Sequence, residues 1–353
     1  FDHESASMSD PAPDDTGRLL RPRLKVQHLL VLVSLSRHRN AHRTARDLGL
    51  SQPAVSKMVR EIEAMFGARL FDRGRGGMQP NSVGAALVAR ATALLNDIDH
   101  TRDEMEALAT GEAGHLRLGA IAFVTPELVA RTLRRLAESG VALTVDIREG
   151  TTQPLVDQLL RREIDCVIGR WATEREGELD QTIVYRQRFA VAVGRDHRRL
   201  GRGRRATLAG AAAEDWVAPP PRTAGRQALT ALFMGSGLPP PRIRVETASL
   251  EIMKALLVDD AMIGLLPADI ARRYAALGEL RILPFSLPTE PAPLTLIRRR
   301  DEQPLPAVGR FCGTLVEVAA DLERAEAQMA RRPARDPARR PRTTADRRPL
   351  PER

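Results

Sequence analysis

The sequence predicts an α/β protein with an all-α winged helix-turn-helix domain at its N-terminal end and a long linker helix behind it. Three observations predict this fold class. Two helical patterns separated by Gly49 precede a short glycine-rich turn, which is the order of a helix-turn-helix and its wing. A helical pattern without Pro then runs over 83–112. From 113 onward, strand and helix patterns alternate, which favours α/β units built on a parallel sheet.

Composition sets the expected boundaries of these parts. The first residues are acidic and polar, and the C-terminal segment is rich in Arg and Pro with almost no apolar content, so both ends are expected to be disordered. The expected parts are a disordered acidic segment (1–17), the winged helix-turn-helix domain (18–81), the linker helix (82–112), the α/β domain (113–326) and a disordered tail (327–353).

The formal charge of +9 is unevenly distributed. Residues 18–80 carry thirteen Lys or Arg against four acidic residues, and 331–353 carry nine Arg against three. A basic segment confined to the helix-turn-helix region indicates nucleic acid as a partner. Only three residues of the chain are Lys, and an Arg-rich coding bias weakens the same argument for the tail.

The sequence gives no sign of a membrane span. It contains no run of eighteen apolar residues and no signal-peptide pattern at its N-terminus. Cys166 and Cys312 are the two cysteines of the chain, and such sparse use indicates a reducing compartment without a metal cluster. A cytoplasmic protein without a membrane partner is therefore expected.

The helix after Gly49 has the residues of a DNA-recognition helix. Ser51 can cap its N-terminus, and Pro53 suits the first turn. Gln52, Ser56 and Arg60 form an exposed row at four-residue spacing, with Lys57 beside it. An amide and a hydroxyl can contact base edges, whereas cations hold phosphates. The alternative interpretation is an ordinary surface helix with solvated polar residues.

Basic residues outside this helix could contact the DNA backbone. Arg43 lies on the preceding helix, which Asn40 can cap, and Arg73 and Arg75 lie in the glycine-rich segment after a short strand at 69–71. Such a wing can follow a minor groove, which attracts cations where it is narrow. A phosphate-binding loop of an NTPase would need Gly-Lys-Ser/Thr at its end, and the segment lacks it.

The linker helix carries an apolar seam at alternating steps of four and three residues. A seam of this period favours an intermolecular coiled coil and hence a homodimer, which would place two recognition helices on one duplex. The seam consists of Leu87, Ala91, Leu94, Ile98, Thr101, Met105 and Leu108.

Residues 24–110 resemble the N-terminal region of LysR-type transcriptional regulators. The motifs are TARDLGLSQPAVSKMVREIEAMFGARLFDR and the wing ending MQPNSVG. A less specific resemblance extends to about residue 320 through VDQLLRREIDCVIGR and DDAMIGLLP. RGGMQPN and the ending IGR are most similar to the subgroup of regulators of galactose-binding-protein and protocatechuate catabolism genes. The chain departs from the family at 81–83, where Asn-Ser-Val replaces an acid-containing segment.

The resemblance implies a ligand-responsive regulator of promoter DNA. It implies two α/β subdomains like those of periplasmic binding proteins, with a small-molecule effector between them. Subdomain I would comprise 113–187 and 291–326, and subdomain II 188–290. It also implies a homotetramer, with RNA polymerase as a candidate further partner. Matching family positions support DNA contacts by Gln52, Pro53, Ser56 and Lys57.

The expected effector residues lie at strand ends and helix starts. Free N–H groups and the helix dipole there favour an anion or a polar oxygen, although ordinary capping explains hydroxyls equally well. Arg170 is the expected carboxylate clamp, with a salt bridge to a neighbouring acid as the alternative. The effector is expected to be a carboxylate or a sugar. The other candidate residues for binding it are Ala122, Phe123, Thr125, Thr151, Thr152, Thr223 and Ser249.

No catalytic triad, paired carboxylate or metal-ligand spacing occurs, so neither an enzyme nor a cofactor is expected. Cys166 and Cys312 are interpreted as small buried apolar residues, because a redox sensor needs reachable thiols in a polar setting. Two alternative functions remain. The chain could be a DNA-binding protein without an effector, or an α/β solute-binding or enzymatic protein with an accessory DNA-binding domain.

Overall fold

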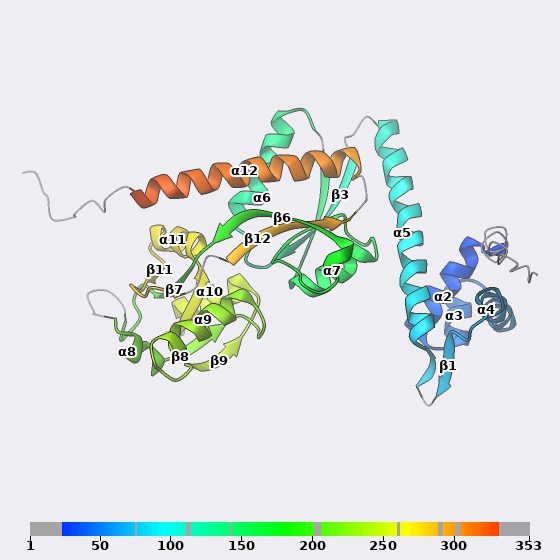
Figure 1. The fold of residues 1–353 in the computed structure, drawn as a ribbon, viewed down its shortest axis with the longest axis horizontal. Coiled ribbons are helices and arrows are strands. Elements are labelled where there is room, and N and C mark those ends of the chain that lie inside the picture. Colours follow the sequence, from blue (N-terminus) through cyan, green and yellow to red (C-terminus); the bar gives the residue numbers. More distant parts are fainter. Residues whose placement is uncertain are drawn as a thin grey trace, which may run out of the picture.

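The protein is described from a computed structural model, in which a helical domain with a two-stranded wing is followed by a long helix and by two five-stranded sheets (Figure 1). The structure describes residues 23–74, 76–110, 114–141, 143–200, 206–259, 262–288, 292–300 and 304–331. The N-terminal segment predicted to be disordered, Arg75, and the tail beyond Arg331 lie outside the described residues.

The helical domain contains α2 (Val26–His38), α3 (Ala41–Asp47) and α4 (Gln52–Phe66). Both predicted caps are present. The Asn40 side chain accepts hydrogen bonds from two backbone N–H groups at the start of α3, and the Ser51 hydroxyl accepts one from Ala54 N at 3.3 Å. These bonds satisfy donors that have no partner inside a helix.

The wing consists of the antiparallel strands β1 (Phe71–Gly74) and β2 (Gly77–Pro80). The predicted strand at 69–71 therefore overlaps the real one only at Phe71. Leu70 has other backbone partners: its N–H donates to Glu63 Oε1 at 2.9 Å, and its carbonyl accepts from Asn81 N at 3.0 Å. The backbone at Leu70 thus ties α4 to the end of the wing instead of extending the strand.

Helix α5 (Ser82–Thr110) is an unbroken helix of 29 residues. Its start has a cap in spite of the unusual sequence at 81–83, because Asn81 Oδ1 accepts from Gly84 N at 2.9 Å. The predicted apolar seam of α5 is divided in the structure.

The N-terminal half of this seam belongs to the core of the helical domain. Ala91 is buried there, and Leu87 packs against the same cluster, whose other members come from α2, α3, α4 and the wing. Leu94, Ile98 and Met105 lie farther along α5 and have exposed fractions of 48%, 48% and 53%. The predicted intermolecular seam is therefore wrong in its first two positions. The side chain of Leu108 lies outside the described residues.

Subdomain I is built on a five-stranded sheet with the order β4-β3-β5-β12-β6. The strands β3, β4 and β5 are parallel, whereas β12 runs antiparallel to both β5 and β6. The strands are β3 (Gly114–Ile121), β4 (Leu143–Gly150), β5 (Cys166–Gly169), β6 (Leu179–Gln187) and β12 (Ala292–Arg299). The helices are α6 (Pro126–Glu138), α7 (Thr152–Leu160), the short η1 (Glu176–Glu178) and α12 (Pro306–Arg331).

Subdomain II is built on a second sheet with the order β11-β7-β10-β8-β9. The strands β8, β9 and β10 are parallel, and β7 runs antiparallel to its two neighbours. The strands are β7 (Phe189–Gly194), β8 (Asp215–Ala218), β9 (Arg242–Glu246), β10 (Ile263–Pro267) and β11 (Leu280–Ile282). The helices are α8 (Leu208–Ala212), α9 (Ala224–Gly235), α10 (Leu250–Asp259) and α11 (Ala268–Ala276).

The α/β domain differs from the prediction in two ways. Both sheets are mixed, because the strand with which the chain enters from the other subdomain runs antiparallel to its neighbours. This strand is β7 in subdomain II and β12 in subdomain I. In addition, α12 continues to Arg331, past the predicted start of the tail at 327. The chain passes between the sheets at Arg188, where β6 ends and β7 begins, and again between β11 and β12.

Among the described residues, no helix is both long and apolar enough to cross a membrane.

The contact between α5 and the segment that joins α4 to β1 predicts that Gly84 is sensitive to substitution. A methyl group at Gly84 would collide with the carbonyl oxygen of Leu70, which is backbone and cannot turn aside. We expect Gly84→Ala to destabilise the protein by about 1–3 kcal/mol, as overpacking does, measured by urea unfolding. Gly313→Ala is the control, because it also adds a methyl group to a helix but meets nothing within 4 Å. An equal loss of stability in both variants would contradict the prediction.

Candidate DNA interface and ligand cavity

The outer surface of α4 presents the residues predicted to contact DNA. Gln52, Pro53, Lys57 and Arg60 are exposed and Ser56 is half-buried, whereas Val55, Val59 and Ile62 of the same helix are buried. The Lys57 side chain is 73% exposed, with Glu61 Oε1 3.7 Å from its Nζ. An exposed pair of this kind contributes little to stability, so Lys57 can exchange Glu61 for a phosphate at low cost.

A groove of about 770 Å³ separates α4 from the wing. Ser56 and Arg60 line it from α4, and Arg73 lines it from β1. Arg69 lines it as well and is exposed, although sequence reasoning did not select it. The sequence offered one indication of this role, because Arg69 is a cation at the start of the strand predicted to lead into the wing. The groove brings three guanidinium groups to one surface between the recognition helix and the wing, where they can contact a phosphate backbone.

The remaining predicted DNA contacts lie elsewhere. Arg43 is exposed on α3. Ser51 is exposed, and its hydroxyl is used as the cap of α4. Arg75 lies outside the described residues.

A second cavity, of about 570 Å³, lies between the two subdomains. Subdomain I contributes the ends of β3, β4 and β5, and subdomain II contributes the segment before α9. The carboxyl ends of parallel strands are the usual place for ligands in α/β sheets. Six of the predicted effector residues line the cavity: Ala122, Phe123, Thr151, Thr152, Arg170 and Thr223.

The other two predicted effector residues do not line it. The Thr125 hydroxyl donates to the Asp269 carboxylate on α11, so it joins the two subdomains. Ser249 Oγ accepts from Ile252 N at 3.3 Å and therefore caps α10. Its neighbour Ala248 lines the cavity instead. For Ser249 the ordinary capping interpretation applies.

Backbone N–H groups also occupy some of the hydroxyls inside the cavity. Thr223 Oγ1 accepts from Arg226 N at 3.3 Å, and Thr152 Oγ1 accepts from Arg170 N at 3.0 Å. Thr151 differs, because its side chain makes no capping hydrogen bond to α7. Among these three described residues, Thr151 is therefore the one whose hydroxyl these backbone hydrogen bonds leave available for a ligand.

Arg170 is a charged residue that lines the cavity from the end of β5. Its guanidinium donates to Gln187 Oε1 and, at 3.2 Å, to the carbonyl of Pro293. Gln187 ends β6 just before the chain passes to subdomain II, and Pro293 follows its return. Arg170 thus joins the two places where the chain crosses. The Phe189 ring lies 5.8 Å from its guanidinium carbon.

Burial lowers the pKa of Arg170 to about 10, and the charge of Asp269 counteracts this effect. The guanidinium therefore remains cationic at neutral pH but has lost much of its hydration. A carboxylate that enters the cavity would meet a positive charge in a weakly screened setting, where a charge-assisted hydrogen bond is strong. Trp171, which is 41% exposed, provides an apolar wall beside it.

Sequence reasoning missed several lining residues from subdomain II. Arg222 and Gln227 line the cavity there, and Phe189 lines it at the crossing. Arg222 has a φ of 67°, an uncommon backbone conformation for a residue with a side chain. No sequence pattern marked these positions, because they reach the cavity only when the second sheet packs across from the first.

Cys166 and Cys312 lie in the apolar core of subdomain I, as predicted. The structure also brings the two thiols together. The pKa of Cys166 is raised well above its usual range, mainly by a hydrogen bond with Cys312 and secondly by burial. Within the described part of the chain, no group of three or more His, Cys, Asp or Glu residues could hold a metal ion.

Comparisons with known proteins agree with this architecture. Residues 26–85 match the family model for bacterial regulatory helix-turn-helix proteins of the lysR family, and residues 109–320 match that for the LysR substrate binding domain. The transcriptional regulator GbpR of Azospirillum brasilense is 27% identical over 305 residues, which cover 86% of this chain and 89% of that protein. PcaQ of Agrobacterium fabrum is 26% identical over 302 residues, covering 85% and 96%.

Solved structures show the same fold. The LysR family transcriptional regulator CbnR has a TM-score of 0.60 and 22% identity, covering 84% of this chain and 99% of its own. ArgP from Mycobacterium tuberculosis has a TM-score of 0.62 and 16% identity, covering 84% and 98%. The two matched family regions span the helical domain and most of both subdomains, and the chain belongs to the LysR family of transcriptional regulators.

Proposed function

We propose that the protein binds promoter DNA through α4 and its wing and responds to a small carboxylate held between the two subdomains. The observation that carries this proposal is the separation of two surfaces in one chain. One is an exposed helix beside a groove with three arginines. The other is a distant cavity with a buried, charged Arg170. The first surface suits DNA, and the second suits an anionic ligand.

The division of labour on α4 follows from side-chain chemistry. Gln52 can make a paired hydrogen bond to adenine, and Pro53 and Ser56 can contact a thymine methyl group. Arg43, Lys57, Arg60 and Arg73 can hold phosphates, which adds affinity without sequence choice. Arg69 joins this second group because it lines the same groove.

The effector would be a carboxylate with an apolar or sugar-like body. Arg170 supplies the charge, the Thr151 hydroxyl supplies a hydrogen bond, and Phe123 and Trp171 supply apolar surface. A ligand on Arg170 would act on the group that holds both chain crossings, and it can shift the two subdomains only by binding one arrangement better than another.

The exposed apolar residues of α5 support a homodimer. Leu94, Ile98 and Met105 recur at four and seven residues on one side of the helix, and exposed apolar stripes of this kind mark association surfaces. A dimer would bring two α4 helices to one duplex. A homotetramer and a contact with RNA polymerase are expectations that rest on family membership.

The proposal is tested by gel shift with the DNA upstream of the chain's own gene and with a scrambled sequence of equal length. We expect specific binding that weakens steeply as salt rises, because phosphate contacts release counterions. Absence of salt-sensitive binding to either DNA would refute a DNA-binding function.

Two substitutions on α4 should separate base recognition from phosphate binding. We expect Gln52→Ala to lower the preference for the specific site by about 1–3 kcal/mol. Lys57→Ala should weaken binding to all sequences and lower the salt slope by about 1. Competition gel shifts at several salt concentrations measure both effects. If Gln52→Ala weakens binding to specific and scrambled DNA equally, the assignment of Gln52 to base recognition is wrong.

The dimer prediction concerns the stripe on α5. Leu94→Glu combined with Ile98→Glu should convert the dimer to a monomer at micromolar concentrations, because buried carboxylates would face each other across the interface. Sedimentation equilibrium measures the mass. Ala89→Glu is the control, since Ala89 is exposed on α5 but lies on the other side of the helix. A doubly substituted protein that remains dimeric would rule out this interface.

The ligand prediction is tested by thermal unfolding with a panel of small carboxylates and a panel of neutral sugars. We expect at least one carboxylate to raise the Tm, with a stabilisation of about 2.7 kcal/mol at one hundred times its Kd. Arg170→Gln and Thr151→Val should reduce this shift. Arg148→Gln, which removes an exposed arginine of β4 outside the cavity, should retain it. Stabilisation by sugars alone would contradict the carboxylate assignment.

A further inference from the structure

Polar contacts join α5 to subdomain I. Asn96 Nδ2 donates to the carbonyl of Arg161 at 2.7 Å. At the next residue of α5, Asp97 Oδ1 pairs with Arg162 Nη1 at 2.9 Å. Both partners belong to the segment that leads from α7 to β5. This segment therefore contacts α5 through a hydrogen bond and an ion pair.

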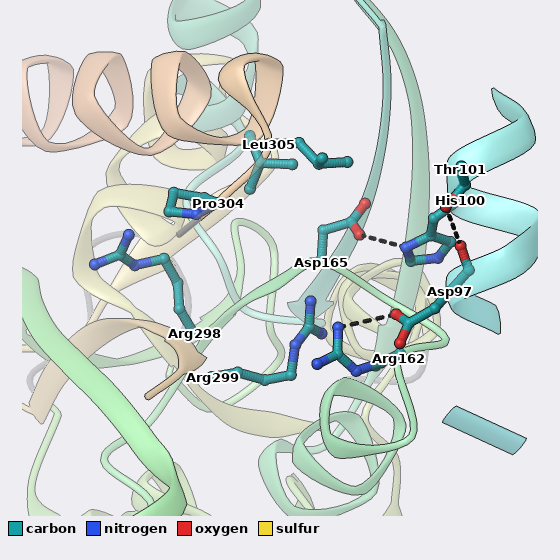
Figure 2. Close-up of a pocket in the computed structure, with 10 residues that line it drawn as sticks. Asp97, His100, Thr101, Arg162, Asp165, Arg298, Arg299, Pro304 and Leu305 are labelled. Carbon is teal, nitrogen blue, oxygen red and sulfur yellow. Dashed lines mark hydrogen bonds and ion pairs between the residues drawn. The ribbon is translucent and has the colours of Figure 1, made fainter. Parts of the chain in front are cut away.

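Two more pairs extend the same contact along α5. His100 Nδ1 lies 3.6 Å from Asp165 Oδ1, and Asp103 pairs with Arg117 of β3. Figure 2 shows the His100 ring directed from α5 toward Asp165, with Asp97 and Arg162 paired beside it. Only 12% of the His100 side chain and 5% of the Asp165 side chain are exposed.

Three of these four contacts occupy the side of α5 opposite its exposed apolar stripe, and Asp97 lies between the two sides. At about 100° per residue, Asn96, His100 and Asp103 fall on one side of the helix, and Leu94, Ile98 and Met105 fall on the other. The apolar cores described for subdomain I contain no residue of α5. Polar groups thus dominate the docking of α5, and water can replace the more exposed of these contacts, such as Asp97 with Arg162, at a small cost in free energy.

A cavity of about 180 Å³ lies behind the contact. It is lined by Asp97, His100 and Thr101 of α5, by Arg162 and Asp165, and by residues of β12 and the start of α12 (Figure 2). Water can therefore reach the pair formed by His100 and Asp165 from within. A proton can reach the imidazole without prior unfolding of either subdomain.

The groups facing His100 carry both signs of charge. Asp97 on α5 and Asp165 before β5 favour the imidazolium, while Arg117 on β3 and Arg299 on β12 oppose it. The residues that α12 and its preceding turn contribute to the cavity, Pro304, Leu305 and Val308, are apolar. Burial is the largest effect, and it lowers the pKa of His100 below its usual value.

We propose that the polar side of α5 and the 161–165 segment form an ionic latch that fixes the orientation of the DNA-binding domain relative to subdomain I, and that protonation of His100 opens it. The neutral imidazole fits the buried position beside Arg117 and Arg299. The imidazolium is better solvated when α5 has moved away and His100 is exposed to water.

The direction of the pH effect follows from proton linkage. In the docked state the pKa of His100 is depressed, and in the undocked state it returns to about 6.5. Docking is therefore fully favoured above about pH 6.5 and weakens as the pH falls from there toward the docked pKa. Over that interval the ratio of undocked to docked protein rises by up to about tenfold per pH unit, because one proton is taken up.

The latch is tested with nitroxide labels at Arg46→Cys on α3 and Glu138→Cys on α6, both exposed positions. Cys166 and Cys312 are buried, which protects them from labelling. Labelled protein is diluted with unlabelled protein so that distances within one chain are measured by pulsed electron spin resonance. We expect one narrow distance distribution at about pH 8 and a second, separate population at about pH 5.5.

Two histidine variants decide whether His100 is responsible. His100→Gln keeps a polar side chain but cannot be protonated, and we expect its distance distribution to be the same at both pH values. His115→Gln is the matched control, because His115 also faces a carboxylate, Asp146, at 3.1 Å, but on the strand β4. It should retain the response to pH. An unchanged distribution in the wild-type protein, or a full response in His100→Gln, would overturn the proposal.

A second measurement reads the titration in the wild-type protein itself. The pKa of each imidazole in the wild-type protein is obtained by NMR titration, with His100→Gln or His100→Asn used to assign the signal. A His100 pKa clearly below 6.5 supports the latch. A value at or above 6.5 overturns it, because protonation would then leave docking unchanged or strengthen it.

Discussion

The continuity of α5 is the constraint on which the rest of the structure depends. Its 29 residues form one helix, which at 1.5 Å per residue spans roughly 44 Å. One end is part of the core of the DNA-binding domain through Ala91, and the other end contacts subdomain I through Asp103. A continuous α-helix curves only gently unless a specific feature kinks it. The orientation of the DNA-binding domain is therefore set where α5 meets each neighbour.

The two ends of α5 are held by different kinds of interaction. At the start, apolar burial and the close backbone contact between Gly84 and Leu70 leave little freedom. At the other end the contacts are hydrogen bonds and ion pairs beside a cavity. Close-packed apolar contacts have few alternative arrangements, whereas polar contacts can exchange with water. Reorientation is thus easier at subdomain I than at the DNA-binding domain.

A comparable asymmetry exists within the α/β domain. Each subdomain has its own apolar cores, while the contacts between them include polar ones, such as Thr125 with Asp269 and Glu127 with Arg273. Arg170 joins this boundary from inside the cavity, because it contacts the residues next to both chain crossings. A ligand in the cavity and the angle between the subdomains therefore depend on the same group.

The sequence by itself determined the elements that local chemistry specifies. The caps Asn40 and Ser51, the recognition helix, and the alternation of strands and helices follow from short-range hydrogen bonding and from the period of apolar residues. The strand ends that carry Thr151 and Arg170 also follow from this pattern. The family was recognisable for the same reason, since its motifs lie within these local elements.

Only the tertiary structure decided which neighbours each side chain has. The period of α5 could not show that Ala91 would be covered by the chain's own domain while Leu94 stayed exposed. The position of Thr125 at a helix start could not show that Asp269 would reach it from the other subdomain. Nor could the spacing of His100 and Asp165 reveal their contact. Each of these contacts joins residues far apart in the chain, and packing between elements, which no local pattern encodes, brings them together.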